Sequence, residues 1–97
     1  MSGSGEVRRY RLLITRPAAR ALALRLPEKV ATAAYEFITG ILVEKPTLVG
    51  KPLLLPPYDG TWSARRGTYR ILYEIDEKKS VVIVTAVEHR SDAYRSH

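Results

Sequence analysis

The sequence predicts an α+β domain in which a helical hairpin packs on one face of a single sheet. Three observations support this fold class: an alternating apolar segment near the start, two helical patterns between residues 15 and 45, and three strand patterns after residue 60. We expect the order strand, helix, helix and then a three-stranded antiparallel meander. In a chain of 97 residues we assign one domain to residues 8–97 and a flexible Gly/Ser leader to residues 1–7.

The first half of the chain supplies one strand and two helices. Tyr10, Leu12 and Ile14 alternate with polar residues, which is typical of a half-buried strand. Thr15 is a suitable cap for a first helix that ends near Leu26. A second helix follows, and its apolar residues recur at a spacing of three and four: Val30, Ala34, Phe37, Ile38, Ile41 and Leu42.

The second half of the chain supplies the meander. Four prolines make residues 45–59 a loop, with a brief extended piece near Leu53. Strands are expected over residues 61–66, 69–75 and 81–88, with a polar turn over residues 76–79. Val81 to Val84 is apolar on both faces, which predicts an interior strand of the sheet.

Composition limits the classes of function. Sixteen Lys and Arg against ten Asp and Glu give a formal net charge of +6, which favours a polyanion or an acidic protein as partner. The absence of Cys excludes disulfides, thiolate zinc sites and a cysteine nucleophile, and makes the cytoplasm the default compartment. No apolar run approaches the roughly 18 residues needed to span a membrane. No metal-ligand spacing or phosphate loop occurs, so any catalysis is expected to need neither metal nor cofactor.

Arginines are expected to gather at the open end of the last hairpin. A turn centred on Lys78 pairs residues whose numbers sum to about 156, which sets Arg66 opposite Arg90. Arg70 would then lie on the same side as both of them and as Glu88. Like charges placed together need anions between them, so a binding site or a set of ion pairs is expected here.

Two interpretations of this cluster stay open. In the first, neighbouring carboxylates neutralise it, with Glu88 on Arg70 and Asp92 on Arg90. In the second, the arginines bind a phosphate group.

His89 and Tyr94 form a candidate acid/base pair beside the arginines. An imidazole suits proton transfer near neutral pH, whereas a phenol needs surrounding guanidinium charge to act as a base. A reaction that requires only an acid, a base and cations around a phosphate is RNA cleavage through the ribose 2′-OH. A plain structural role for either residue, as a strand-end histidine or a tyrosine at the core edge, stays open as well.

Two segments carry a resemblance to a known family. Gly60 to Asp76, with its Gly-Thr-Tyr-Arg-Ile-Leu-Tyr run, and Val87 to Arg95, with His-Arg-Ser-Asp-Ala-Tyr, resemble the RelE family of toxins from bacterial toxin–antitoxin pairs. Val49 to Leu53 and the Leu26-Pro27 join are similar to its actinobacterial branch. The resemblance covers nearly the whole domain. It implies the same α+β fold, a RelB-like antitoxin that wraps the toxin, and cleavage of messenger RNA in the ribosomal A site.

The resemblance also implies roles for single residues. Arg70 and Arg90 match arginines that bind the phosphate and stabilise the transition state. Tyr94 matches a tyrosine that orients or activates the 2′-OH, and His89 falls where an acid or base is found. Four further basic residues are expected to hold substrate or ribosomal RNA: Arg65, Arg66, Lys51 and Lys45.

One departure from the family keeps two alternatives open. Thr61 and Ser63 stand where the best-known members place two lysines. A non-catalytic basic RNA-binding relative is therefore one alternative. The other is a ParE-like toxin, which binds DNA gyrase and cleaves no RNA. The Tyr94-Arg95 tail and the arginine-rich strands favour the ribonuclease.

Overall fold

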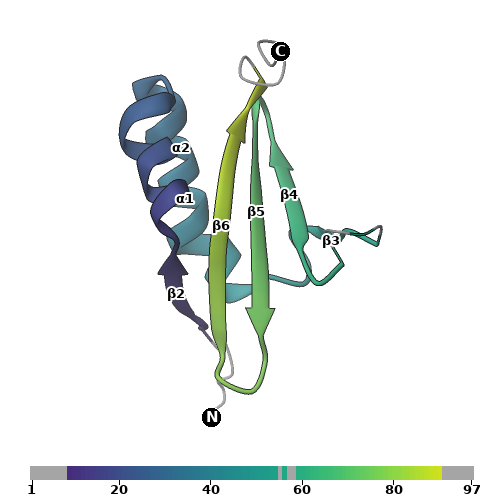
Figure 1. The fold of residues 1–97 in the computed structure, drawn as a ribbon. Coiled ribbons are helices and arrows are strands. Elements are labelled where there is room, and N and C mark those ends of the chain that lie inside the picture. Colours follow the sequence, from purple (N-terminus) through teal and green to yellow (C-terminus); the bar gives the residue numbers. More distant parts are fainter. Residues whose placement is uncertain (1–8, 55, 57–58, 91–97) are drawn as a thin grey trace.

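The computed structural model describes residues 9–54, 56 and 59–90, which form a helical layer on one side of a sheet (Figure 1). The leader expected over residues 1–7 lies outside the described residues, as does Tyr94. The elements are β2 (Arg11–Ile14), α1 (Arg16–Arg20), η1 (Ala21–Arg25), α2 (Glu28–Phe37), η2 (Ile38–Leu42), β3 (Lys51–Pro52), β4 (Trp62–Arg66), β5 (Tyr69–Asp76) and β6 (Val81–His89). Here η1 and η2 are π-helical continuations of α1 and α2.

The sheet confirms the expected α+β class. Its strand order is β2-β6-β5-β4-β3, and β4, β5 and β6 form the expected antiparallel meander. As the apolar Val81 to Val84 segment predicts, β6 is an interior strand. The brief extended piece of the proline loop is β3, which pairs with β4. The parallel pairing of β2 with β6 joins segments about seventy residues apart, and no local sequence pattern predicts it.

Thr15 does not cap the first helix in the expected way. It stands at the N-cap position, but its side chain makes no capping hydrogen bond. Its hydroxyl instead donates to the carbonyl oxygen of Thr85 at 3.2 Å, and its N–H donates to that of Val84 at 3.0 Å. Thr15 therefore fixes the start of α1 against β6.

The register of the β5–β6 hairpin differs from the expected one. Asp76 pairs with Val81, so paired residue numbers near the turn sum to 157 and not to 156. A β-bulge between Leu72 and Tyr73 adds a second one-residue shift. The unpaired residue of β6 is Thr85, whose hydroxyl donates to the carbonyl oxygen of Leu72. Side chains alternate between the two faces of a strand with a period of two, so two one-residue shifts cancel. Even-numbered residues of β5 and β6 beyond the bulge therefore share a face, as expected.

The core lies between the helices and one face of the sheet. Ala18 and Ala34 are completely buried, and their small side chains let both helices approach the strands closely. The strands contribute large fully buried side chains to the same layer: Ile71, Tyr73, Val82 and Val84. Burial of this apolar surface is the main stabilising contribution to such a fold.

Two buried phenols fasten the central strand to the helical layer. The hydroxyl of Tyr73 donates to the carbonyl oxygen of Pro46 at 2.6 Å, and that of Tyr69 donates to Ala33 at 3.3 Å. Burial raises the pKa of Tyr73 to about 12. Burial also raises the pKa of Tyr69, against an opposing effect of the nearby Arg66 charge.

Gly50 lets the loop after η2 lie against Tyr73. A Cβ at position 50 would be 2.2 Å from the Tyr73 hydroxyl oxygen and 2.8 Å from the Ser63 carbonyl oxygen. Only a residue without a side chain fits between these atoms.

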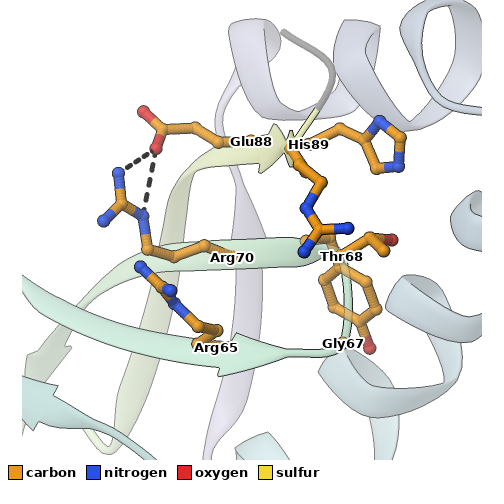
Figure 2. A pocket seen from close by; sticks show the side chains of 8 residues that line it. Arg65, Gly67, Thr68, Arg70, Glu88 and His89 are labelled. Carbon is orange, nitrogen blue, oxygen red and sulfur yellow. Dashed lines mark hydrogen bonds and ion pairs between the residues drawn. The ribbon is translucent and has the colours of Figure 1, made fainter. Parts of the chain in front are cut away.

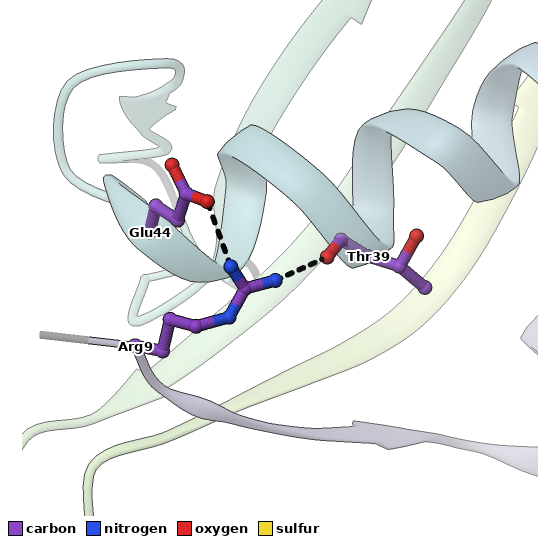
Figure 3. A network of polar contacts seen from close by, with 3 residues as sticks. All are labelled: Arg9, Thr39 and Glu44. Carbon is purple, nitrogen blue, oxygen red and sulfur yellow. Dashed lines mark hydrogen bonds and ion pairs between the residues drawn. The ribbon is translucent and has the colours of Figure 1, made fainter. Parts of the chain in front are cut away.

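Arg9 ties the beginning of the described chain to the end of the second helix. Its guanidinium donates to Glu44 Oε2 at 2.8 Å and to the carbonyl oxygen of Thr39 at 3.0 Å, as Figure 3 shows. The Arg9 side chain is 56% exposed, so this pair adds little stability and mainly orients the approach to β2. Within the described ranges, no helix is both long enough and apolar enough to cross a membrane.

Replacement of Gly50 by alanine should destabilise the fold by roughly 1 to 3 kcal/mol, because the methyl group would displace Tyr73 or the β4 backbone. Gly40→Ala is the matched control, since apart from the neighbouring residues and the backbone of its own helix no atom lies within 4 Å of its added Cβ, and it should stabilise by about 0.4 to 1 kcal/mol. Urea unfolding of both variants measures the difference. Equal free energies of unfolding would contradict the close approach at Gly50.

Because the pKa of Tyr73 is raised in the folded protein, the free energy of unfolding should change with pH in the alkaline range. The folded protein holds the phenol proton more tightly than the unfolded chain, whose tyrosine pKa is about 10. This contribution to the free energy of unfolding is therefore complete below about pH 10 and is lost as pH rises toward the folded-state value of about 12. Urea unfolding between pH 8 and pH 11.5 should show a steeper loss for the wild type than for Tyr73→Phe. Parallel curves would refute the assignment to Tyr73.

Candidate functional site

The sheet face opposite the helices carries a row of charged side chains. Cross-strand partners share a face, and the register pairs Arg65 with Arg70 and Arg70 with Glu88. These three side chains cross β4, β5 and β6 in one line, on the same side in Figure 2. Lys51 on the edge strand β3 pairs with Ser63, two residues before Arg65, and therefore lies on the same face beside this line.

Arg70 is held by a carboxylate. Its Nε and Nη2 atoms donate to Glu88 Oε1 at 3.1 and 2.5 Å, and the side chains of Arg70 and Glu88 are 40% and 45% exposed. The first interpretation of the cluster is therefore confirmed for Arg70. An ion pair this exposed contributes at most about 1 kcal/mol, so an incoming anion can displace Glu88.

A pocket of about 250 Å³ lies at the open end of these strands. Its lining is Arg65, Gly67, Thr68, Tyr69, Arg70, Glu88, His89 and Arg90 (Figure 2). Gly67, with φ of +58°, makes the two-residue turn that brings the end of β4 beside β5. The N–H of Arg90 donates to the carbonyl oxygen of Thr68 at 2.7 Å, which holds the end of β6 against that turn.

His89 points away from Arg70. It pairs with Tyr69, so by alternation it belongs to the helix-facing side of the sheet, and Figure 2 shows its ring directed opposite to Arg70. The pocket thus extends around the end of the sheet, with Arg70 on one side and His89 on the other. Tyr94 and Asp92, which the sequence analysis assigned to the same end, lie outside the described residues.

Arg66 does not join the cluster, and the expectation that it shares a side with Arg70 is wrong. The two-residue turn pairs Arg66 with Tyr69, so its side chain points toward the helices. Its guanidinium carbon lies 4.8 Å from the centre of the Phe37 ring, a cation–π contact. The signal that predicts this arrangement is the Gly67-Thr68 pair between two strand patterns, because a two-residue turn fixes the register.

Of the two lysines expected to bind RNA, one lies on the arginine-bearing face and the other does not. Lys51 is exposed and lies on the arginine-bearing face, next to Ser63. Lys45 is also exposed but follows the end of the second helix and does not line the pocket. Thr68, which no charge or motif in the sequence singles out, also lines the pocket, and its carbonyl oxygen accepts the hydrogen bond from the Arg90 N–H.

Comparisons with known proteins agree with this fold. Residues 13–94 match the family model described as ParE toxin of type II toxin-antitoxin system, parDE. Toxin RelG and Toxin RelE of Mycobacterium tuberculosis are each 45% identical over 86 residues, which cover 89% of this chain and 97% and 87% of theirs.

Solved structures give the same result. In the toxin-antitoxin complex RelBE2 from M. tuberculosis, one chain superposes with a TM-score of 0.80 at 43% identity, covering 86% of this chain and all of that one. The isolated E. coli RelE toxin superposes with a TM-score of 0.66 at 21% identity, over 88% of this chain and 90% of its own, and shares the fold. With a family model that spans most of its length and relatives at 45% identity, the chain belongs to the RelE/ParE family of toxins of type II toxin–antitoxin systems.

Proposed function

We propose that this toxin inhibits translation as a metal-independent endoribonuclease that cleaves messenger RNA in the ribosomal A site. The observation that carries the proposal is the placement of Arg65 and Arg70 side by side on an open sheet face, with an exchangeable carboxylate on Arg70. Guanidinium groups so arranged suit a phosphodiester.

The reaction needs little beyond charge and position. The ribose 2′-oxygen attacks the adjacent phosphorus, the bond to the 5′-oxygen breaks, and a proton moves from the 2′-OH to the solvent or a base while the leaving oxygen gains one. Arg70 and Arg90 stabilise the additional negative charge at phosphorus. Tyr94 is assigned to the 2′-OH. His89 can serve as acid or base only for a ribose that passes over the β4–β5 turn, because it points away from Arg70.

Lys51 offers a substitute for an absent lysine. Ser63 occupies one of the two positions where the best-known relatives have lysine, and the cross-strand neighbour of Ser63 is Lys51. Neighbours of this kind have Cβ atoms roughly 5 Å apart, so the Lys51 ammonium can reach the same anion. Arg65 lies two residues along the same strand and binds the RNA backbone beside it. This placement weighs against a purely non-catalytic relative.

Dependence on the ribosome follows from the small number of catalytic groups. Alignment of the 2′-oxygen with its leaving group supplies much of the rate in such a reaction, and the ribosome can provide that alignment. Substrate and ribosome both belong to the cytoplasm. Lys45, which lies away from the pocket, is assigned to ribosomal contact only.

We also assign a RelB-like antitoxin as partner. The RelBE2 structure of M. tuberculosis is described as a toxin-antitoxin complex, and its 43% identity to this chain supports a similar assembly. The family model, described by the name ParE, favours a second candidate: a toxin that binds DNA gyrase without cleaving RNA.

Replacement of Arg70 by alanine should reduce cleavage of a programmed messenger RNA by about a hundredfold or more, because a charge-stabilising donor at phosphorus is lost. Tyr94→Phe should cause a loss of about a hundredfold or more through the missing hydroxyl. Cuts are mapped with purified protein in the presence and absence of ribosomes. Wild-type cuts should fall at the A-site codon and require ribosomes.

Arg11→Ala is the matched control for Arg70→Ala. Arg11 is an exposed arginine of β2 at the opposite end of the sheet, and its loss should change the cleavage rate by less than about twofold. A folded, toxic wild type that produces no cuts would refute the ribonuclease. A gyrase supercoiling assay would then test the second candidate.

Replacement of Glu88 by glutamine should raise the affinity for single-stranded RNA by up to about fivefold, since an exposed ion pair competes with at most about 1 kcal/mol. Glu74→Gln is the control, because it removes the same charge from an exposed position of the neighbouring strand β5. Fluorescence anisotropy at fixed salt measures both dissociation constants. Equal affinities for the two variants would mean that Glu88 does not occupy the phosphate site.

A further inference from the structure

A second group of arginines lies on the first helical segment, outside the pocket described above. Arg16, Arg20 and Arg25 are all exposed, and together with Pro17 they line a separate pocket of about 340 Å³. We call these three residues the α1 arginine row. The proposed cleavage of messenger RNA does not use them.

The local helix geometry aligns the row. Arg16 and Arg20 are four residues apart, about one turn of α-helix. Arg25 follows five residues after Arg20, a spacing that would carry it off this face in a regular α-helix. Because residues 21–25 form the π-helical segment η1, in which hydrogen bonds join residues five apart, Arg25 stays on the face of the other two. The row extends over roughly 14 Å at 1.5 Å per residue.

The row does not stabilise the fold. Among the described residues, none of the three arginines forms an ion pair or side-chain hydrogen bond, and the first turn of α1 holds no acidic residue. A cation at a helix N-terminus opposes the helix dipole, which disfavours Arg16. Like charges four residues apart, as in Arg16 and Arg20, also destabilise a helix. An arrangement with these costs is explained by an anion supplied from outside.

The row begins near the candidate site. Thr15, directly before Arg16, is hydrogen-bonded to Val84 and Thr85 of β6. Glu88 lies three residues farther along the same strand, roughly 10 Å at the rise of a β-strand. Because Arg70 lies on the sheet face opposite the helices, an RNA contacts the row and the Arg70 site together by passing around the edge of the sheet at β2.

We propose that the α1 arginine row is a second binding surface for the phosphate backbone of RNA, and that it holds ribosomal RNA while the Arg70 site engages the messenger. The ribosomal setting rests on the proposed function. Guanidinium groups bind phosphates bidentately. The pocket is lined by three arginines and one proline, with no strand residue, and the charged groups of this lining are all guanidiniums, which suit the repeated phosphates of a nucleic-acid backbone. RNA is therefore favoured over an acidic protein segment.

The test uses the full chain with Arg16, Arg20 and Arg25 all replaced by glutamine. Its affinity for purified bacterial 70S ribosomes, programmed with a messenger that carries 2′-O-methyl groups at the A-site codon, should fall at least tenfold at 0.1 M salt. The slope of log affinity against log salt concentration should decrease by about 2, as expected when three phosphate contacts are lost. The melting temperature should change little, because the unfavourable positions of Arg16 and Arg20 are offset by the favourable position of Arg25 in the last turn.

The matched control replaces Arg11, Lys78 and Lys79 by glutamine. This variant loses the same charge from exposed positions at the opposite end of the sheet, and its ribosome affinity should change by less than twofold. An equal loss of affinity in both variants would overturn the proposal, since only net charge would matter. Unchanged ribosome affinity combined with weaker binding of a RelB-like antitoxin would overturn it in favour of a protein partner.

The cleavage assay separates this inference from the proposed function. A wild type that cuts no messenger but binds ribosomes through the row would refute the ribonuclease and support the RNA surface. A wild type that cuts in the A site, with the row variant binding as tightly as wild type, would refute the surface and keep the enzyme.

Discussion

The hydrogen bond from Tyr73 to the Pro46 carbonyl is the constraint on which the arrangement of layers depends. It joins the middle of β5 to the loop that leaves the helical layer, and Gly50 allows that loop to lie against the phenol. The loop continues as β3, whose position determines where Lys51 stands. A contact within the core therefore sets the edge of the basic face, although no charged residue takes part in it.

The sheet has two faces with different tasks. Alternation sends Tyr69, Ile71 and Tyr73 into the core and leaves Arg70 on the open side. Because the open face needs no apolar residues for packing against the helices, it can hold like charges close together. The energetic consequence is small, since the Arg70–Glu88 ion pair is exposed. The hydrophobic core and the arginine cluster thus lie on opposite sides of the same strands.

The sequence was sufficient for the parts of the fold that depend on local patterns. Alternation and helical spacing predict the helical hairpin and the meander, and the arginine count predicts a basic site at the open end. The register was not accessible, because the position of the bulge at Thr85 depends on contacts with Thr15, seventy residues away. The prediction for Arg66 was wrong for a different reason. It used the register of the β5–β6 hairpin, whereas the two-residue turn at Gly67 pairs Arg66 with Tyr69 and so determines its face.

The bulge at Thr85 divides the β5–β6 ladder into two segments that can vary separately. The half near the turn pairs with β2 and belongs to the core, whereas the half beyond the bulge carries the Arg70–Glu88 pair. An insertion or deletion in the turn, compensated by loss or displacement of the bulge, leaves the arginine on its original face. Lineages with hairpins of different length can therefore retain the same arginine-bearing face, and an alignment without gaps at the bulge would compare residues from opposite faces.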